Sequence, residues 1–280
     1  MSQRTNTDYL RNNQYKDGSN LNARINLHRR FSTNPADWFR WVFEHLELPI
    51  QATCLELGCG PGILWMHNLD RISNQWRIHL SDFSPGMLLE AIQSTISLPN
   101  TFNFTALDAQ AIPYPSGYFD LVIANHMLYH IPDRQKAFCE IQRILKSTGR
   151  VIAATNGLHH MTEIRKLRAQ LGPSLAGQTD HAWGVSEFTI ENGVEQLIPW
   201  FDNIRVIPFV NSLEVTEAEP LLDYILSMTT TPVKDISPQT ISTFTQLINQ
   251  RIAALGSIHI TISTAIFIAY KKMTSTDHDE

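Results

Sequence analysis

The chain reads LELGCGPG from Leu55 to Gly62, and this stretch decides how the surrounding sequence folds. The apolar run from Thr53 to Leu57 ends directly at a turn in which every second residue is glycine, and a helical pattern begins at Ile63. Glycine lacks the Cβ atom that would block a tight turn or a close approach of backbone to a ligand. The stretch therefore predicts a ligand-binding turn between a strand and a helix.

Short apolar runs alternate with helical segments on both sides of this turn. The expected strands are 53–57, 77–81, 102–106, 121–125 and 150–155, and the expected helices between them are 63–72, 85–97 and 134–145. Such alternation predicts a largely parallel sheet with helices on both faces. In an open parallel sheet the turn after the first strand lies at the carboxyl edge, where ligands bind.

The flanking segments follow this alternation less closely. Residues 1 to about 20 lack apolar periodicity and are expected to form an arm that is mobile or ordered by a ligand. The remaining predicted elements are helices from Leu21 and over 37–46, 160–171, 194–200, 220–228 and 238–254, a loop over 173–184, strands over 204–210 and 258–270, and a frayed tail after Lys272.

Composition excludes several classes of protein. The 280 residues are 43% hydrophobic and 18% charged, which is enough apolar material for a buried core. The net charge of -5 gives no global reason to bind nucleic acid or an anionic membrane. Three cysteines form neither a disulfide framework nor a CxxC pair, and the apolar run at 258–270 is shorter than the roughly 20 residues of a membrane span. A reduced, cytoplasmic protein is expected.

The glycine turn departs from the dinucleotide fingerprint. GxGxxG would require a third glycine at position 63 or 65, where this chain has Ile63 and Trp65. That third glycine permits close packing of the helix and opens its N-terminus to a pyrophosphate. An NAD-dependent oxidoreductase is therefore disfavoured.

The turn resembles the cofactor loop of class I S-adenosylmethionine-dependent methyltransferases. Three further segments resemble motifs of that family: HLSDFSPGML with Asp82, LDA with Asp108, and FDLVIAN over 119–125. The resemblance covers residues 50 to 156. It implies a Rossmann-like, doubly wound α/β fold with a seven-stranded sheet, an antiparallel last strand and a helical lid. On this basis 1–46 is an arm with lid helices, 47–156 the cofactor-binding core, and 157–280 the rest of the sheet with lid insertions.

The resemblance also implies which residues bind the cofactor. Asp82 would hold the two ribose hydroxyls, Phe83 would pack on the adenine, and Asp108 would accept from the adenine amino group. Glu56 would organise the loop or meet the methionine ammonium through water. The expected cofactor set is Tyr15, Arg24, Glu56, Gly58, Cys59, Gly60, Gly62, Asp82, Phe83, Met87, Asp108, Ala109 and Asn125.

The N-terminal stretches LNARINLHRRFS (21–32) and WFRWVF (38–43) resemble small-molecule methyltransferases of bacterial type, in which a helical pair folds over the cofactor. The similarity places Tyr15 and Arg24 near the methionine end, where an arginine pairs with a carboxylate bidentately. The alternative is a solvated helix face that carries Arg24, Arg29 and Arg30.

Methyl transfer needs a protein base only if the acceptor must lose a proton, and histidine is suited to that task. His126 and His130 follow the fourth expected strand, His159 and His160 follow the fifth, and His28 belongs to the lid. His130 has a structural alternative as a backbone-binding residue. An unprotonated amine acceptor would need no base. Because Asn125 and His126 stand where paired acids would be required, no metal is expected.

The acceptor site is expected outside the common core, with Trp183 and Phe188 as aromatic candidates. The apolar residues of the insertion over 216–254 would roof this site, pack on the sheet or form a dimer face. We expect methyl transfer to N, O or C of a small metabolite or natural product by a monomer or homodimer, without nucleic acid or membrane. The alternatives are a quinone or lipid-like acceptor, and a non-catalytic binder of S-adenosylmethionine or S-adenosylhomocysteine.

Overall fold

The protein folds around a seven-stranded mixed sheet. The computed structural model describes residues 5–96, 102–170, 187–229 and 233–272. The strand order is β3-β2-β1-β4-β5-β9-β6, and β9 runs antiparallel to both of its neighbours. The strands are β1 (Ala52–Leu57), β2 (Trp76–Asp82), β3 (Phe102–Ala106), β4 (Phe119–Asn125), β5 (Leu145–Asn156), β6 (Phe201–Pro208) and β9 (Thr264–Lys271). The predicted Rossmann-like sheet with an antiparallel last strand is confirmed.

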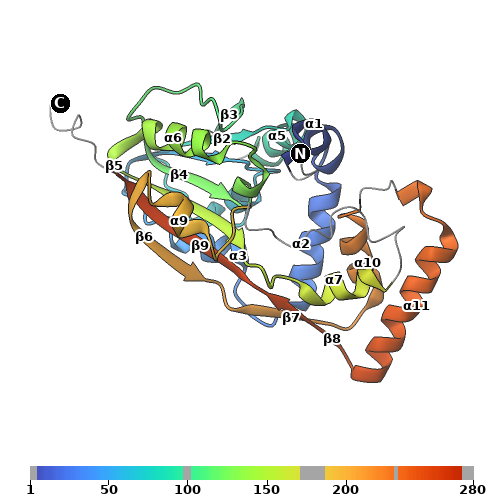
Figure 1. The fold of residues 1–280 in the computed structure, drawn as a ribbon. Coiled ribbons are helices and arrows are strands. Elements are labelled where there is room, and N and C mark those ends of the chain that lie inside the picture. Colours follow the sequence, from blue (N-terminus) through green and yellow to red (C-terminus); the bar gives the residue numbers. More distant parts are fainter. Residues whose placement is uncertain (1–4, 97–101, 171–186, 230–232, 273–280) are drawn as a thin grey trace.

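The central strands are buried on both faces, which explains their unbroken apolar sequence. In β4, Leu121 and Ile123 belong to one core cluster, and Val122 and Ala124 belong to the cluster on the opposite face. Helices cover the sheet on both sides (Figure 1). They are α3 (Trp38–Glu44), α4 (Ile63–Met66), α5 (Pro85–Thr95), α6 (Arg134–Ile144) and α9 (Gly193–Leu197), with short 3-10 turns η3 (Leu69–Arg71) and η4 (Leu128–His130).

A third apolar core forms beyond the carboxyl edge of the sheet. Its helices are α2 (Ser19–Phe31), α7 (Thr162–Ala169), α10 (Ala218–Leu226) and α11 (Pro238–Leu255), with the 3-10 turn η5 (Val233–Asp235). Leu221 and Ile225 of α10 pack in this core with Leu27 of α2 and Phe244 of α11. Figure 1 shows these helices gathered at one end of the molecule. We call this unit, together with β7 and β8, the lid. The described part of the insertion therefore packs in a core of its own, separate from the two core clusters of the main sheet.

The expectation of one strand over 258–270 is wrong. This run forms β8 (Ile258–Ile262) and β9, and β8 pairs antiparallel with β7 (Asn211–Val215) in a separate two-stranded sheet. The sequence does carry a sign of the break: apolar and polar residues alternate up to Ile262, Ser263 and Thr264 follow, and an unbroken apolar run begins at Ala265. The sequence prediction also missed β7. Because β8 continues directly into β9, the lid is joined to the main sheet by one extended segment.

The N-terminal arm is folded where the structure describes it. Residues 7–14 form a short helix, α1 (Thr7–Tyr9), and a π-helical segment, η2 (Leu10–Gln14). The Ser84 hydroxyl donates to the Tyr15 carbonyl at 2.6 Å, and the Gly18 amide donates to Glu90 at 2.8 Å. A Cβ at Gly86 would lie 1.9 Å from the Lys16 carbonyl oxygen. These contacts to α5 involve backbone groups, which leave no apolar periodicity in the sequence.

Two expectations lie outside the described residues: the loop over 173–184, with Trp183, and the tail beyond Lys272. Among the helices that the structure describes, none is both long and apolar enough to cross a bilayer.

Candidate functional site

A cavity of about 730 Å³ lies between the carboxyl ends of the central strands and the lid. Its wall includes every member of the expected cofactor set except Gly62. Gly62 is the residue before α4; a Cβ there would make ordinary contact with Ala91 at 3.6 Å, so its left-handed backbone, and not close packing, favours glycine. The structure thus brings twelve of the thirteen predicted residues to one chamber.

The glycine turn begins where β1 ends. Gly58, Gly60 and Gly62 all have positive φ, at 67°, 54° and 80°. A side chain at Gly58 would collide with Met127, whose Cβ lies 2.8 Å from the position of the added Cβ. At Gly60 the nearest atom belongs to Leu21 of α2, at 3.4 Å. The turn is therefore pressed against the loop after β4 on one side and against α2 on the other.

Asp82 closes β2 opposite this turn and fixes its shape. Its carboxylate accepts from the Gly60 amide at 2.9 Å and from the Ser84 amide at 2.7 Å. Burial raises the pKa of Asp82, while these backbone donors oppose the rise. A carboxylate held in this way presents its remaining lone pairs to the cavity.

Glu56 is buried beneath the turn and is tied to α4. It accepts a hydrogen bond from the Trp65 indole at 2.7 Å. Burial raises the pKa of Glu56 to about 8. A carboxyl group that holds its proton and bonds to a helix organises the loop. Trp65, which breaks the dinucleotide fingerprint, is thus the partner of Glu56.

The other wall of this end is formed by Phe83, Met87, Asp108 and Ala109. Asp108 follows β3 and accepts from the Gln110 amide at 2.9 Å. Phe83 is 39% exposed, and the Arg11 guanidinium lies 6.0 Å from the centre of its ring. Phe83 therefore presents a free aromatic surface beside the arm, as a residue that packs on a planar group requires.

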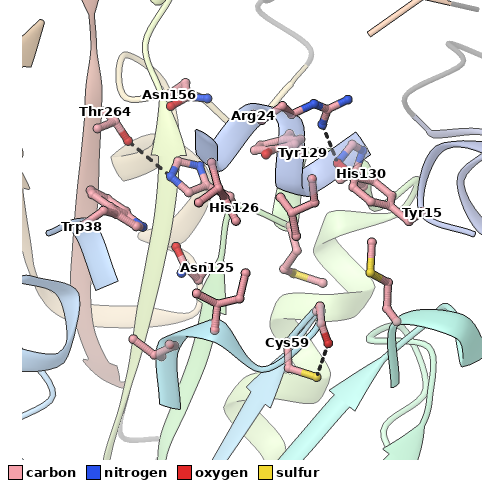
Figure 2. Close-up of a pocket in the computed structure, with 18 of the residues that line it drawn as sticks. Tyr15, Arg24, Trp38, Cys59, Asn125, His126, Tyr129, His130, Asn156 and Thr264 are labelled. Atoms are coloured by element: carbon pink, nitrogen blue, oxygen red, sulfur yellow. Dashed lines mark hydrogen bonds between the residues drawn. The ribbon is translucent and has the colours of Figure 1, made fainter. Parts of the chain in front are cut away.

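Arg24 and Tyr15 meet at the arm side of the cavity. The Tyr15 hydroxyl lies 2.9 Å from His130 Nε2, and Arg24 donates to Tyr15 at 3.4 Å (Figure 2). Arg24 also donates to the hydroxyl and the carbonyl of Ser227, at 3.1 and 2.9 Å. Among the described residues all its hydrogen-bond partners are neutral, so this guanidinium retains a full positive charge for an anionic ligand group. The alternative of a solvated helix face does not hold for Arg24.

The structure separates the candidate histidines. His28, His126, His130 and His160 line the cavity. His159 is exposed and is absent from the cavity wall. Of the two histidines after the fifth strand, His160 is therefore the one placed to act on an acceptor. The reason is local: Met161 has φ of 54° and α7 begins only at Thr162, which turns His160 inward. The His130 side chain meets the Tyr15 hydroxyl, and the alternative of a backbone-binding role for His130 stays a prediction.

Burial sets the protonation of the inner histidines. It lowers the pKa of His28 to about 4 and that of His126 to about 4, and the neighbouring His28 and His130 add to the effect on His126. Burial and nearby positive groups also hold the pKa of His160 well below its usual range. These imidazoles are neutral at physiological pH.

This state of the histidines predicts a pH-dependent stability. The ordinary imidazole pKa of 6.5 falls to about 4 in the folded protein at His28. Between these values the unfolded chain binds the extra proton, so the free energy of unfolding falls as pH drops from 6.5 to 4, by roughly 3 kcal/mol for one group. Glu56, with a raised pKa, acts in the opposite direction between pH 4.5 and about 8.

Urea unfolding at several pH values checks this. The difference between the wild type and His28→Asn isolates the histidine, because Glu56 is common to both. The wild type should lose more stability than the variant on acidification from pH 6.5. Parallel curves for the two proteins would contradict the prediction.

Sequence reasoning missed several residues of the inner chamber. Trp38 lies 5.2 Å from the His126 ring, centre to centre, and Thr264 of β9 lies beside its other edge (Figure 2). Asn156 and Arg168 also line the wall. The stretch WFRWVF pointed to Trp38 only as part of a helix, and no local signal singles out Thr264, which lies 138 residues from His126.

Phe188 does not serve the acceptor. Its side chain is 0% exposed and packs between Phe138 and Phe267 in the core of the sheet.

Within the described residues no group of three or more His, Cys, Asp or Glu side chains is arranged to hold a metal ion.

Residues 55–153 match the family model of the methyltransferase domain. The malonyl-[acyl-carrier protein] O-methyltransferase of Magnetococcus marinus is 28% identical over 169 residues, which are 59% of this chain and 60% of that protein. The ubiquinone/menaquinone biosynthesis C-methyltransferase of Xanthomonas oryzae is 27% identical over 40% of this chain and 45% of its own. The chain thus matches less than two thirds of the length of either relative.

Among solved structures, Haemonchus contortus phosphoethanolamine N-methyltransferase 2 with phosphomonomethylethanolamine and S-adenosylhomocysteine has a TM-score of 0.57 at 18% identity. The match covers 95% of this chain and 60% of that one. The [4+2]-cyclase SpnF has a TM-score of 0.55 at 16% identity, with 87% of each chain covered. Both likenesses concern the fold.

Proposed function

Since residues 55–153 belong to the class I S-adenosylmethionine-dependent methyltransferase family, we propose that the protein transfers a methyl group from S-adenosylmethionine to nitrogen, oxygen or carbon of a small metabolite or natural product. The observation that carries this proposal is one continuous cavity. It joins the glycine turn, Asp82 and Asp108 at one end to the lid at the other. Its volume of about 730 Å³ suits a cofactor with a small acceptor beside it.

The side chains that line the cavity match the chemical groups of the cofactor. Asp82 offers carboxylate oxygens for two ribose hydroxyls, and Asp108 offers an acceptor for the adenine amino group. Phe83 supplies the exposed ring between them. At the opposite end Arg24, whose described partners are neutral, would pair with the methionine carboxylate, in the geometry that favours arginine over lysine.

The bound cofactor supplies an activated methyl group, so the residues of this chain mainly position the acceptor and exclude water. Asn125 and His126 end β4 at the middle of the cavity, and Trp38 covers the His126 ring. The arm closes the cofactor end through Tyr15 and His130. The lid closes the acceptor end with apolar side chains that include Ile164 and Met228.

Two alternatives remain distinct from a small polar acceptor. A quinone or lipid-like acceptor is favoured by the apolar lid, and one relative carries the name of a ubiquinone/menaquinone C-methyltransferase. A protein that binds the cofactor without methyl transfer is the second alternative, because a fold does not fix a reaction. The likeness to a [4+2]-cyclase illustrates that point.

Calorimetry and a transfer assay test the proposal together. We expect S-adenosylmethionine and S-adenosylhomocysteine to bind with micromolar affinity, and NAD not to bind. Incubation with S-adenosylmethionine labelled in the methyl group and panels of polar metabolites, phenols and quinones should then give a labelled product. Binding of NAD alone would overturn the proposal. Cofactor binding without any labelled product across all panels would favour the non-catalytic binder.

A further inference from the structure

The hydrogen bonds of Thr264 bear on which nitrogen of His126 carries the proton. Its hydroxyl donates to the Thr155 carbonyl at 3.1 Å and lies 3.4 Å from His126 Nε2 (Figure 2). A hydroxyl has one proton, and a carbonyl oxygen can only accept. The Thr264 oxygen must therefore accept from His126, which requires the proton on Nε2 and leaves Nδ1 with a lone pair.

The rest of the structure holds the imidazole in place. The His126 amide donates to the Ala154 carbonyl at 3.2 Å, and the residue has a φ of 58°, a left-handed conformation that costs energy for a residue with a Cβ. Trp38 packs against the ring at 5.2 Å. On the other side, the register of β5 with β9 pairs Asn156 with Thr264, which fixes the hydroxyl.

Nδ1 is the nitrogen without a role in this arrangement. It is buried and has no hydrogen-bond partner among the described residues, and the same is true of the neighbouring Asn125 Oδ1. A buried polar atom that is left unpaired destabilises the fold, so such atoms call for an explanation. Both atoms are acceptors, and both residues line the middle of the cavity. A ligand that brings hydrogen-bond donors into the cavity would satisfy both atoms.

We propose that Thr264 is a positioning residue that holds His126 as the Nε2–H tautomer, so that Nδ1 accepts the proton of an O–H or N–H nucleophile on the methyl acceptor. This inference rests on the proposed function and narrows it to oxygen or nitrogen nucleophiles that carry a proton. The burial that keeps His126 neutral, with a pKa of about 4, leaves its lone pair available at physiological pH.

The step balances. The nucleophile forms its new bond to the methyl carbon while the carbon–sulfur bond breaks, and the electron pair of that bond stays on sulfur in S-adenosylhomocysteine. The proton of the nucleophile passes to Nδ1 and gives an imidazolium, whose Nε2–H still donates to Thr264. The positive charge of the sulfonium thus ends on His126. The loss of that proton to solvent resets the site.

Nitrogen-15 NMR of histidine-labelled protein tests the tautomer without any acceptor. The His126 resonances are assigned by their loss in His126→Asn. In the wild type we expect a protonated Nε2 and an unprotonated Nδ1. Thr264→Ser, which keeps the hydroxyl, should retain this pattern, whereas Thr264→Val, of nearly equal shape, should shift the signals toward a mixture of tautomers. A wild type with Nδ1 protonated would overturn the inference, as would an unchanged pattern in Thr264→Val.

A second measurement probes Nδ1 with phenol in the presence of S-adenosylhomocysteine. Phenol should move the Nδ1 resonance toward that of a hydrogen-bonded nitrogen, and anisole, which lacks the O–H, should not. Equal shifts with both compounds, or none with phenol, would refute the role of Nδ1. Calorimetry of S-adenosylhomocysteine on the same proteins tests the proposed function separately from the tautomer. Failed cofactor binding would contradict the proposed function and leave the tautomer result standing.

Discussion

Asp82→Asn is expected to weaken S-adenosylmethionine binding at least about 100-fold. Hydrogen bonds to a charged group contribute roughly 1.5–3 kcal/mol each. Two such bonds to the ribose hydroxyls therefore correspond to about two orders of magnitude or more in Kd. The amide also turns one acceptor into a donor, which faces the Gly60 or Ser84 amide in the ligand-free protein.

Calorimetry against Asp133→Asn provides the matched comparison. Asp133 accepts from the Lys136 amide at the start of α6, and asparagine fills that position equally well. The residue is exposed and is not part of the cavity wall, so this variant should bind like the wild type. An Asp82→Asn protein that unfolds at the wild-type temperature and keeps its affinity would show that the ribose lies elsewhere.

Gly58→Ala is expected to reduce both stability and cofactor affinity, and Gly117→Ala separates the two causes. Both glycines have nearly the same φ, 67° and 66°, so both variants carry the strain of a left-handed alanine, about 1–2 kcal/mol. A Cβ at Gly117 meets nothing within 4 Å, whereas at Gly58 it meets Met127 Cβ at 2.8 Å. The collision adds about 1–3 kcal/mol to the loss at Gly58.

The clash also displaces the loop after β4, which carries His126 next to Met127. We therefore expect Gly58→Ala to lose more free energy of unfolding than Gly117→Ala in urea titrations. The Gly58 variant should also bind S-adenosylmethionine more weakly, with the affinity of the Gly117 variant unchanged. Equal losses of stability in the two variants would mean that Met127 moves aside freely and that the turn is not confined.

The parts of the site that could be predicted from the sequence are those that follow a strand end. Gly58 and Asp82 come directly after predicted strands and Asp108 comes two residues after one, and parallel strands deliver such residues to one edge. Thr264 could not be found in this way, because its contact with His126 joins strands that only the three-dimensional fold brings together. Which of His159 and His160 faces the cavity depends on the left-handed conformation of Met161, and the residue type does not predict that conformation.

The fold shows the same division. Apolar runs located the sheet strands, since burial on both faces produces them. They did not locate the division between β8 and β9, although the alternating pattern up to Ile262 changes to an unbroken apolar run after Thr264, because one long strand also fits these residues. The arm escaped prediction because its contacts with Gly86 and Ser84 use backbone atoms of Lys16 and Tyr15. Such contacts depend on shape, and side-chain patterns do not encode them.

Helix α2 links the lid to the glycine turn. Leu27 and Phe31 near its end belong to the lid core, while Leu21 near its start lies against Gly60 and Arg24 reaches Ser227 of the segment after α10. A molecule seated on the turn is thus enclosed by an element that cannot shift alone. We therefore expect release of a molecule bound at the turn to require arm and lid to open together, a type of motion that is slow in other proteins.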